Sequence, residues 1–359
     1  MIKMNIKIAM LFVITTFLFS NCKRDENIID DSQSVLNKEV LSDLSNGIIT
    51  ETYKTMYLRA VDLNDKVGAM GIGDQVVLDE ARQLWRDTRN AWEQSEGFLF
   101  GPVDNEGIDP AIDSWPVDVN AIDNILNSSN EINSSLLESN NEARGFHTIE
   151  YFLWGINGNK TANDFTLREL AYLKAATQNL EDKTLQLYHA WAVEQGNYAG
   201  NFINAGVANS SIYASQKNAL QEIVEGMVII ADEVANGKIE TPLNGNNGAA
   251  QPEAEESRFS ANSKDDFANN IRSIQNLYNG SYLNNQVKGI DKIVLIKNAA
   301  LDAQIKVKVQ DAISAIEAIP GTFTDAIFNN RASVINAQTK VAELKYLLES
   351  QLEPLISNL

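Results

Sequence analysis

Residues Gly145 to Glu150 place a histidine and a carboxylate at a spacing that can hold a cation. His147 and Glu150 are three residues apart, so on a helix they lie on the same face. An imidazole nitrogen and a carboxylate oxygen are both ligands that transition metals accept. A bare His-x-x-Glu is more often a hydrogen-bonded pair at the start of a helix, and that alternative stays open from these residues alone.

Further ligands would have to be carboxylates, because the chain has 2 histidines and a catalytic zinc site needs three protein ligands. The other histidine, His189, lies in an amphipathic helical stretch and is interpreted as structural. Glu96, at the end of a predicted helix, is the first candidate ligand, and Asp118 is the second. Each has an ordinary alternative, because Asp118 can cap a helix that starts at Val119 and Glu96 can be solvated. An imidazole with carboxylates suits iron, manganese or zinc.

The residues around the pair resemble the Gly-x-His-x-x-Glu signature of the imelysin family, with Gly145 before it and an aromatic run to Gly155 after it. Other stretches, in the same order, resemble further blocks of that family: Trp85-Arg86, Arg89, Trp92, Glu96, Phe98 to Val103, Trp115 to Asp118, Glu256 to Ser260, Asp266-Phe267, and Asn270 to Gly280. The resemblance covers nearly all of the chain after its N-terminal segment. It implies two all-α bundles with the signature histidine facing the cleft between them.

Three residues from the blocks are candidates for a ligand-binding cleft. Trp115 lies in a loop rich in proline and is placed at the cleft, whereas most other aromatic residues are expected in the core. Arg258 and Ser260 come from the second half, and Arg258 can pair with a carboxylate or an anionic ligand. The alternative for this segment is helix entry, with Ser260 or Ser263 as an N-cap.

The chain has 359 residues and a formal net charge of −19, which excludes nucleic-acid binding because phosphates would be repelled. Hydrophobic residues make up 44%, which is typical of a globular protein. A surface this acidic attracts cations weakly everywhere. One carboxylate by itself is therefore poor evidence for a metal-binding site.

The N-terminus predicts secretion and a lipid anchor. Residues 1–21 read as a signal peptide, with Lys3 and Lys7 before an apolar run that is too short to span a bilayer. The run ends at Cys22, the only cysteine, in a context that resembles a bacterial lipobox although Phe19 and Asn21 depart from its pattern. The expected location is the cell envelope, as an outer-membrane lipoprotein, and the charged residues after Cys22 resemble a surface-export signal. The alternative is a plain secretory signal with an incidental cysteine.

Residues 22–32 read as a tether, and beyond them apolar residues recur at helical spacing nearly throughout. Helices are expected over 35–70, 78–95, 167–193, 212–235, 265–277, 290–319 and 334–348, with irregular stretches at 101–118 and 241–256. We expect an all-α fold of two tandem bundles of about four helices each, over residues 33–200 and 201–359, with an interdomain cleft.

Two functions follow from these features. The first is an envelope protein that binds a metal ion, above all iron, or a small metal-containing ligand as part of uptake. The second is a metallopeptidase, which the resemblance also implies, but the histidines do not supply a full zinc ligand set. No Gly-x-Ser-x-Gly and no activated nucleophile is evident. Binding is therefore favoured over catalysis, and a lipoprotein that engages a protein partner through its helices is a third option.

Overall fold

The computed structural model describes residues 26–359, with side chains from residue 32 onward. The fold of this part is all-α, as predicted. Its only paired strands are β1 (Ser281–Tyr282) and β2 (Asn285–Gln286), a short antiparallel hairpin in which Ser281 pairs with Gln286. None of the described helices is long and apolar enough to cross a membrane. The predicted signal peptide and Cys22 lie outside the described residues.

The first half contains four long helical segments. The first runs from α1 (Glu26–Leu44) through the π-helical segment η1 (Ser45–Thr50) into α2 (Glu51–Gly68), and it begins inside the predicted tether. The others are α3 (Gln75–Glu93), α8 (Gly145–Trp154) and α9 (Leu167–Trp191). Polar side chains set their starts: the Asp74 carboxylate accepts from the Val77 N–H at the start of α3, and Thr166 with Glu169 forms a capping box at α9. Helix α2 packs against both α3 and α9.

The second half also has four long helical segments. They are α11 (Gln216–Asp232), which continues through the π-helical η5 (Glu233–Ile239) into α12 (Glu240–Asn244); α13 (Ser263–Asn279); α15 (Ala299–Glu317); and α17 (Arg331–Leu347), which continues through η7 (Leu348–Leu352) into α18 (Glu353–Ser357). Shorter helices α14 (Asp291–Lys297) and α16 (Phe323–Asn329) complete this half. The predicted single helix over 290–319 was wrong, because the Asn298 side chain accepts from the Leu301 N–H at 3.1 Å and starts α15 anew.

Short elements fill the connections between these helices. The stretch 101–118, predicted to be irregular, contains α4 (Pro102–Asn105) and α5 (Ile108–Asp113), which its glycines and prolines keep short. The remaining short elements are η2 (Glu96–Phe98), α6 (Val119–Asn127), α7 (Ser134–Leu137), η3 (Asn141–Ala143), η4 (Ala162–Asp164), α10 (Ala199–Ile203) and η6 (Pro252–Ala254).

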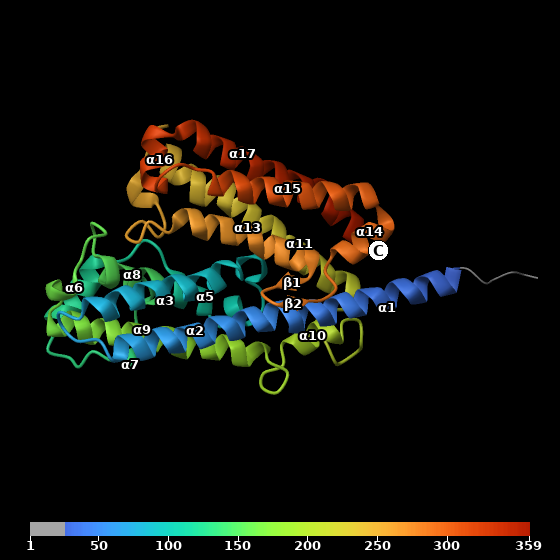
Figure 1. Cartoon of the computed structure of the whole chain (residues 1–359). Coiled ribbons are helices and arrows are strands. Elements are labelled where there is room, and N and C mark those ends of the chain that lie inside the picture. Colours follow the sequence, from blue (N-terminus) through green and yellow to red (C-terminus); the bar gives the residue numbers. More distant parts are fainter. Residues whose placement is uncertain (1–25) are drawn as a thin grey trace, which may run out of the picture.

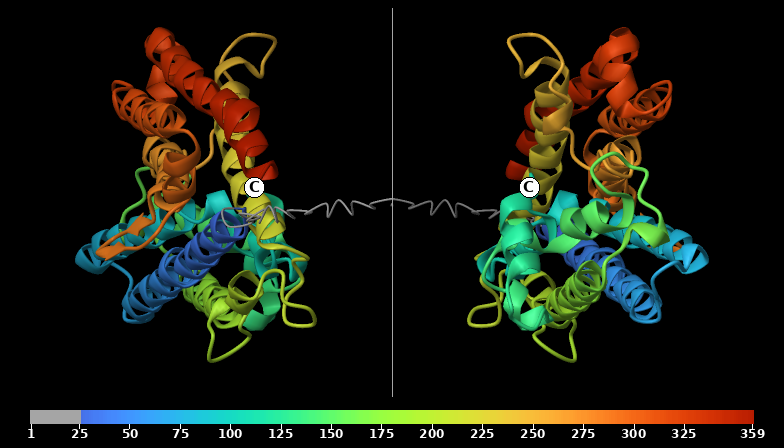
Figure 2. Two further views of the ribbon diagram at one scale, coloured as in Figure 1. Left: turned by 90° about the vertical axis from the view of Figure 1, so that its right-hand side faces the viewer. Right: turned by 90° about the vertical axis from the view of Figure 1, so that its left-hand side faces the viewer.

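The two halves form two layers, with the blue-to-green helices of the first half on one side and the orange-to-red helices of the second on the other (Figures 1 and 2). Helix α13 packs against α3 of the first half and α15 of its own, and α11 packs against η2 and α1. One continuous cluster of buried apolar residues runs through both halves. The boundary at residue 200 therefore stays a prediction, whereas the contact between the layers positions the site described next.

Candidate metal centre

The first turn of α8 brings His147 against the end of α5. Gly145 has φ +77°, and a Cβ atom there would clash with the Ile112 carbonyl oxygen. Only glycine allows this close approach without strain. The Trp85 indole N–H donates to the Phe146 carbonyl at 3.0 Å and fixes the same turn to α3. The glycine of the sequence motif thus places His147 beside Asp113, a residue that the motif does not contain.

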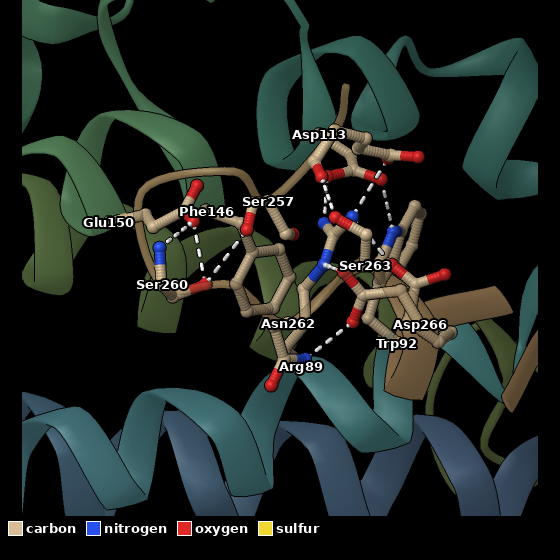
Figure 3. A network of polar contacts seen from close by, with 12 residues as sticks. Arg89, Trp92, Asp113, Phe146, Glu150, Ser257, Ser260, Asn262, Ser263 and Asp266 are labelled. Carbon is tan, nitrogen blue, oxygen red and sulfur yellow. Dashed lines mark hydrogen bonds and ion pairs between the residues drawn. The ribbon is translucent and has the colours of Figure 1, made fainter. Parts of the chain in front are cut away.

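Both ring nitrogens of His147 face carboxylates. Nδ1 lies 3.3 Å from Glu150 Oε2, and Nε2 lies 3.1 Å from Asp113 Oδ1 and 3.6 Å from Glu256 Oε1. The other oxygen of Glu150 accepts from the Ser260 backbone N–H at 2.7 Å and from its hydroxyl at 2.6 Å (Figure 3). Glu150 therefore orients the imidazole from one side, and Nε2 points into a second group of acids.

Arg89 lies at the middle of that second group. Its guanidinium forms ion pairs with Asp113, with Glu93 Oε1 at 2.5 Å and with Glu256 Oε1 at 2.8 Å, and its Nε lies 3.7 Å from Asp266 Oδ2 (Figure 3). The Arg89 side chain is 0% exposed. These carboxylates come from α3, α5, the segment before α13, and α13 itself. One arginine thus ties together elements from both halves of the chain.

Lys238, on the π-helical segment η5, supplies the other fixed positive charge. Its Nζ lies 2.9 Å from Glu96 Oε2, 3.1 Å from Glu256 Oε2 and 3.9 Å from Glu93 Oε2. π-helical segments inside α-helices are rare and are frequently found at functional sites, although η1 and η7 in this chain lie outside the network. Here the segment η5 places Lys238 in contact with the carboxylates of Glu96 and Glu256.

Carboxylates outnumber the fixed cations in this central charge network, which we define as Arg89, Lys238, His147, Glu93, Glu96, Asp113, Glu150, Glu256 and Asp266. Burial raises the pKa of Glu93 to about 8 and that of Asp266 to about 6, and it holds the pKa of Glu96 well above its usual range. Burial opposes ionisation of Glu256 as well, but Lys238, His147 and Arg89 together keep its pKa well below the usual value. The network therefore carries a surplus of desolvated acid that protons or an added cation can balance.

Oxygen and nitrogen atoms of Asp113, His147 and Glu256 lie within 4.8 Å of one another, a spacing that fits a single metal ion. Although Nε2 of His147 is close to two carboxylate oxygens, it is buried without a well-directed hydrogen bond. One imidazole and two carboxylates suit zinc, iron or manganese. Glu93, Glu96 and Asp113 form a second such group that shares Asp113 with the first. The residues present therefore fit a metal ion.

The structure distributes the four predicted metal ligands over different positions. His147 is in the first group and Glu96 in the second. Glu150 contacts the ring nitrogen of His147 that faces away from Asp113 and Glu256, so it lies behind the histidine. Asp118 is in neither group, because its carboxylate caps α6 by accepting from the Ala121 N–H at 2.9 Å. His147 and Glu150 are both 0% exposed.

The sequence prediction missed Asp113, Glu256, Arg89, Glu93 and Lys238 as site residues. A signal for one of them was present: Arg89 lies four residues after Trp85 and three before Trp92, on the apolar face of α3. An arginine on a face that packs into the core must meet acids there. Glu93 follows at the next turn of the same face. Nothing local distinguishes Asp113 from the other acids of the 101–118 stretch.

A cavity of about 730 Å³ adjoins the network. The predicted cleft residues Trp115 and Arg258 line it, together with Lys238 and Glu256 at the side of the metal ligands. The Trp115 ring lies 4.9 Å from the His147 ring and 5.8 Å from the Phe259 ring, measured between centroids. Ser260, the third predicted cleft residue, contacts Glu150 instead. The lining comes from both halves of the chain, since it includes Val117 and Ile156 of the first and Thr241 and Gln251 of the second.

The profile of the family described as imelysin matches residues 49–351.

The chain belongs to the imelysin family.

The matched range contains His147, Glu150, Asp113, Glu256, Arg89 and Lys238, so the whole central charge network lies in the part that the imelysin family shares. The chain is 28% identical over 345 residues to "Iron-regulated protein A" of Synechococcus elongatus, with 94% of this chain and 90% of that protein covered. A solved iron-regulated protein A precursor from Parabacteroides distasonis is 27% identical, with a TM-score of 0.77 over 94% of this chain and 96% of that one. An imelysin-like protein from Psychrobacter arcticum, 17% identical, has the same fold, with a TM-score of 0.72 over 90% of this chain and 96% of that one.

Proposed function

We propose that this imelysin-family protein binds a transition-metal ion, most favourably iron, through Asp113, His147 and Glu256 in the cleft between its two layers, and that it serves metal uptake at the cell envelope. The observation that carries the proposal is the convergence of these three donors beside a surplus of buried carboxylates. An added cation would offset charge that burial otherwise makes costly. The names of the Synechococcus and Parabacteroides relatives support iron in particular.

Glu150 favours binding over peptide cleavage. A metallopeptidase needs a carboxylate that is free to act as a general base next to the metal-bound water. Both Glu150 oxygens are engaged, one by His147 and one by Ser260, on the side of the ring away from Asp113 and Glu256. The metallopeptidase reading therefore lacks its base at the motif, and peptide cleavage by the metal-loaded protein would contradict the proposal.

The test is calorimetric titration of chelator-treated protein with Fe²⁺, Zn²⁺ and Mn²⁺ under anaerobic conditions. We expect one transition-metal ion to bind, and His147→Ala to weaken binding by at least about 10-fold, which corresponds to about 1.4 kcal/mol. His189→Ala is the matched control, because the chain's other histidine lies on α9 outside both metal groups. Absence of binding to the wild type, or equal loss in the two variants, would overturn the proposal.

The envelope location is proposed from the sequence at Cys22, which resembles a lipidation site after a signal peptide. Expression of the full chain should give a mature form that starts at Cys22, carries lipid and fractionates with membranes. Cys22→Ser should release the protein from membranes or leave it uncleaved. A mature N-terminus at another residue, found by mass spectrometry, would refute the lipid anchor without affecting the metal site.

A further inference from the structure

The cavity beside the metal ligands is larger than a metal ion requires. About 730 Å³ lies in the range of small-molecule sites, which are mostly apolar with a few polar groups. Apolar side chains make up one wall: Trp115, Pro116, Val117, Val119, Ile156 and Phe259. Ile156 is 56% exposed, although it is a large apolar residue at the edge of a concave surface. Covering this wall with a flat apolar molecule would remove apolar surface from water, which is favourable in free energy.

Arg258 is a cation of the cavity lining that makes no ion pair and no side-chain hydrogen bond. Among the arginines of residues 26–359, it alone makes no ion pair and no side-chain hydrogen bond, and its Nε is buried without a partner. Its guanidinium stacks on the Phe259 ring at 5.1 Å, which holds it at the wall. Arg86, on the neighbouring α3, donates to the Ser260 carbonyl and to Asn262. A guanidinium that remains unpaired in a pocket has the fork geometry that carboxylates match.

The other charges at the cavity do not compete for this role. Lys238 is already bound by Glu96 and Glu256, and Glu256 is bound in turn by Arg89. The remaining acids of the lining, Glu233 and Glu253, are exposed residues, and partial burial of the Glu233 carboxyl raises its pKa, which favours its neutral form. Arg258 interacts with Glu255 through charge alone, without an ion pair or a hydrogen bond, so its guanidinium keeps donors for a bound molecule.

We propose that this cavity binds an organic anion with a flat apolar body, such as an aromatic carboxylate, whose acid group pairs with Arg258 while its body packs against the apolar wall that Trp115 and Phe259 form in contact with each other. The site adjoins the metal ligands through Glu256 but uses different side chains. It therefore stands or falls independently of the proposed metal site.

The probes are three naphthalene derivatives of nearly equal size: 2-naphthoate, 2-naphthamide and 2-naphthylmethylammonium. Each is titrated by calorimetry into the whole chelator-treated protein, so metal binding cannot contribute. We expect 2-naphthoate to bind at least about 10-fold more tightly than the neutral amide. The ammonium compound should bind most weakly. No detectable binding of 2-naphthoate below about 1 mM, or tighter binding of the ammonium compound, would overturn the proposal without reference to any variant.

Variants then assign the contacts. Arg258→Gln should remove the preference for the carboxylate while retaining binding of the amide. Arg272→Gln is the matched control, because Arg272 pairs with Glu317 and does not line the cavity. Trp115→Leu should weaken all three probes by a similar factor. If Arg258→Gln and Arg272→Gln keep the same preference for 2-naphthoate, Arg258 does not receive the anion and the proposal is wrong.

Discussion

Two groups of buried carboxylates in this chain differ in how their charge is balanced. Where α14 meets α15, Lys306 binds Asp291 at 3.1 Å and Asp302 at 3.0 Å, and Lys292 binds Asp291 at 3.0 Å. The lysines of this α14–α15 cluster remain 40% and 44% exposed, so each acid has a countercharge in contact with water. In the central charge network, Arg89 is fully buried and acids outnumber cations. Buried acids alone therefore do not indicate a site, whereas an unbalanced excess of them does.

The largest expected difference between the two groups concerns loss of a cation. Arg89→Met leaves several desolvated carboxylates unpaired and should lower the free energy of unfolding by about 3–5 kcal/mol. Lys306→Met removes a cation that is 40% exposed and should cost at most about 1 kcal/mol. Urea denaturation at pH 7, followed by circular dichroism, measures both. Similar costs for the two variants would show that the central network is not electrostatically special.

The second prediction concerns the backbone that closes the central network. Gly145→Ala combines a strained φ with a clash against the Ile112 carbonyl, whereas Gly107→Ala has a similar φ, +62°, with open space around it. We expect Gly145→Ala to cost about 1–3 kcal/mol more than Gly107→Ala in the same denaturation assay. It should also weaken metal binding, because α5 must move away from α8. A variant that retains full metal affinity would show that Asp113 does not depend on this approach.

A third prediction compares the central charge network with the α14–α15 cluster in its effect on metal affinity. Burial opposes protonation of His147, but Asp113, Glu150 and Glu256 raise its pKa well above the usual value, so a metal at Nε2 must displace a proton. With that proton gone, Glu150 can accept the remaining proton on Nδ1 and keep Nε2 directed at the metal. Glu150→Gln can donate to Nδ1 instead and should therefore reduce affinity for Zn²⁺ by about 10-fold in calorimetric titration. Asp302→Asn, in the α14–α15 cluster, is the control and should leave affinity unchanged. Unaltered binding by Glu150→Gln would mean that the carboxylate does not select the tautomer.

The smallest expected effect is the pH dependence of stability. Burial raises the pKa of Glu93 to about 8, of Glu255 to about 7 and of Asp266 to about 6, so each binds its proton more tightly when folded than when unfolded. Their contribution to stability is complete below about pH 4 and is lost as the pH rises towards 8. The melting temperature of metal-free protein should fall by at least about 2 °C between pH 5 and pH 8.

The comparison variant for that measurement is Glu93→Gln, which removes the group with the highest of these pKa values and should flatten the decline. Asp113 does not contribute in this window: burial opposes its ionisation, but Arg89 and His147 lower its pKa, so its stabilisation is lost only in more acidic solution. A melting temperature that rises from pH 5 to pH 8 would contradict the charge surplus directly.

Local patterns in the sequence predicted the helices well, since each long apolar stripe forms a helix in the structure. The failure at Asn298 is instructive, because the apolar spacing continues past it and hides the cap. The pair His147 and Glu150 could be predicted as neighbours, since three residues separate them on one helix. Its chemistry could not, because which ring nitrogen meets which acid depends on the packing of α5 and of the segment before α13.

Asp113 and Asp118 show the same limit within one loop. Both are aspartates in the 101–118 stretch, and only their distance from α8 distinguishes the proposed metal ligand from the helix cap. The sequence offered helix capping as the alternative role of Asp118, the residue before Val119, and in the structure Asp118 caps α6. Glu256 reaches the site from the other half of the chain, and that pairing arises from tertiary contacts between distant segments. Arg89 was the exception, because an arginine on an apolar helix face is a signal that sequence alone provides.

Lys238 competes with free cations for the carboxylates of the central charge network. Its ammonium is attached to η5 and lies among Glu93, Glu96 and Glu256, so it behaves as a counter-ion at an effective concentration of the order of millimolar or more. Any free cation that binds to the group formed by Glu93, Glu96 and Asp113 must compete with the Lys238 ammonium for these carboxylates. Monovalent ions, which match its charge but lack the tether, are at a disadvantage there. If the network binds a metal ion as proposed, Lys238 should therefore disfavour monovalent ions relative to ions of higher charge.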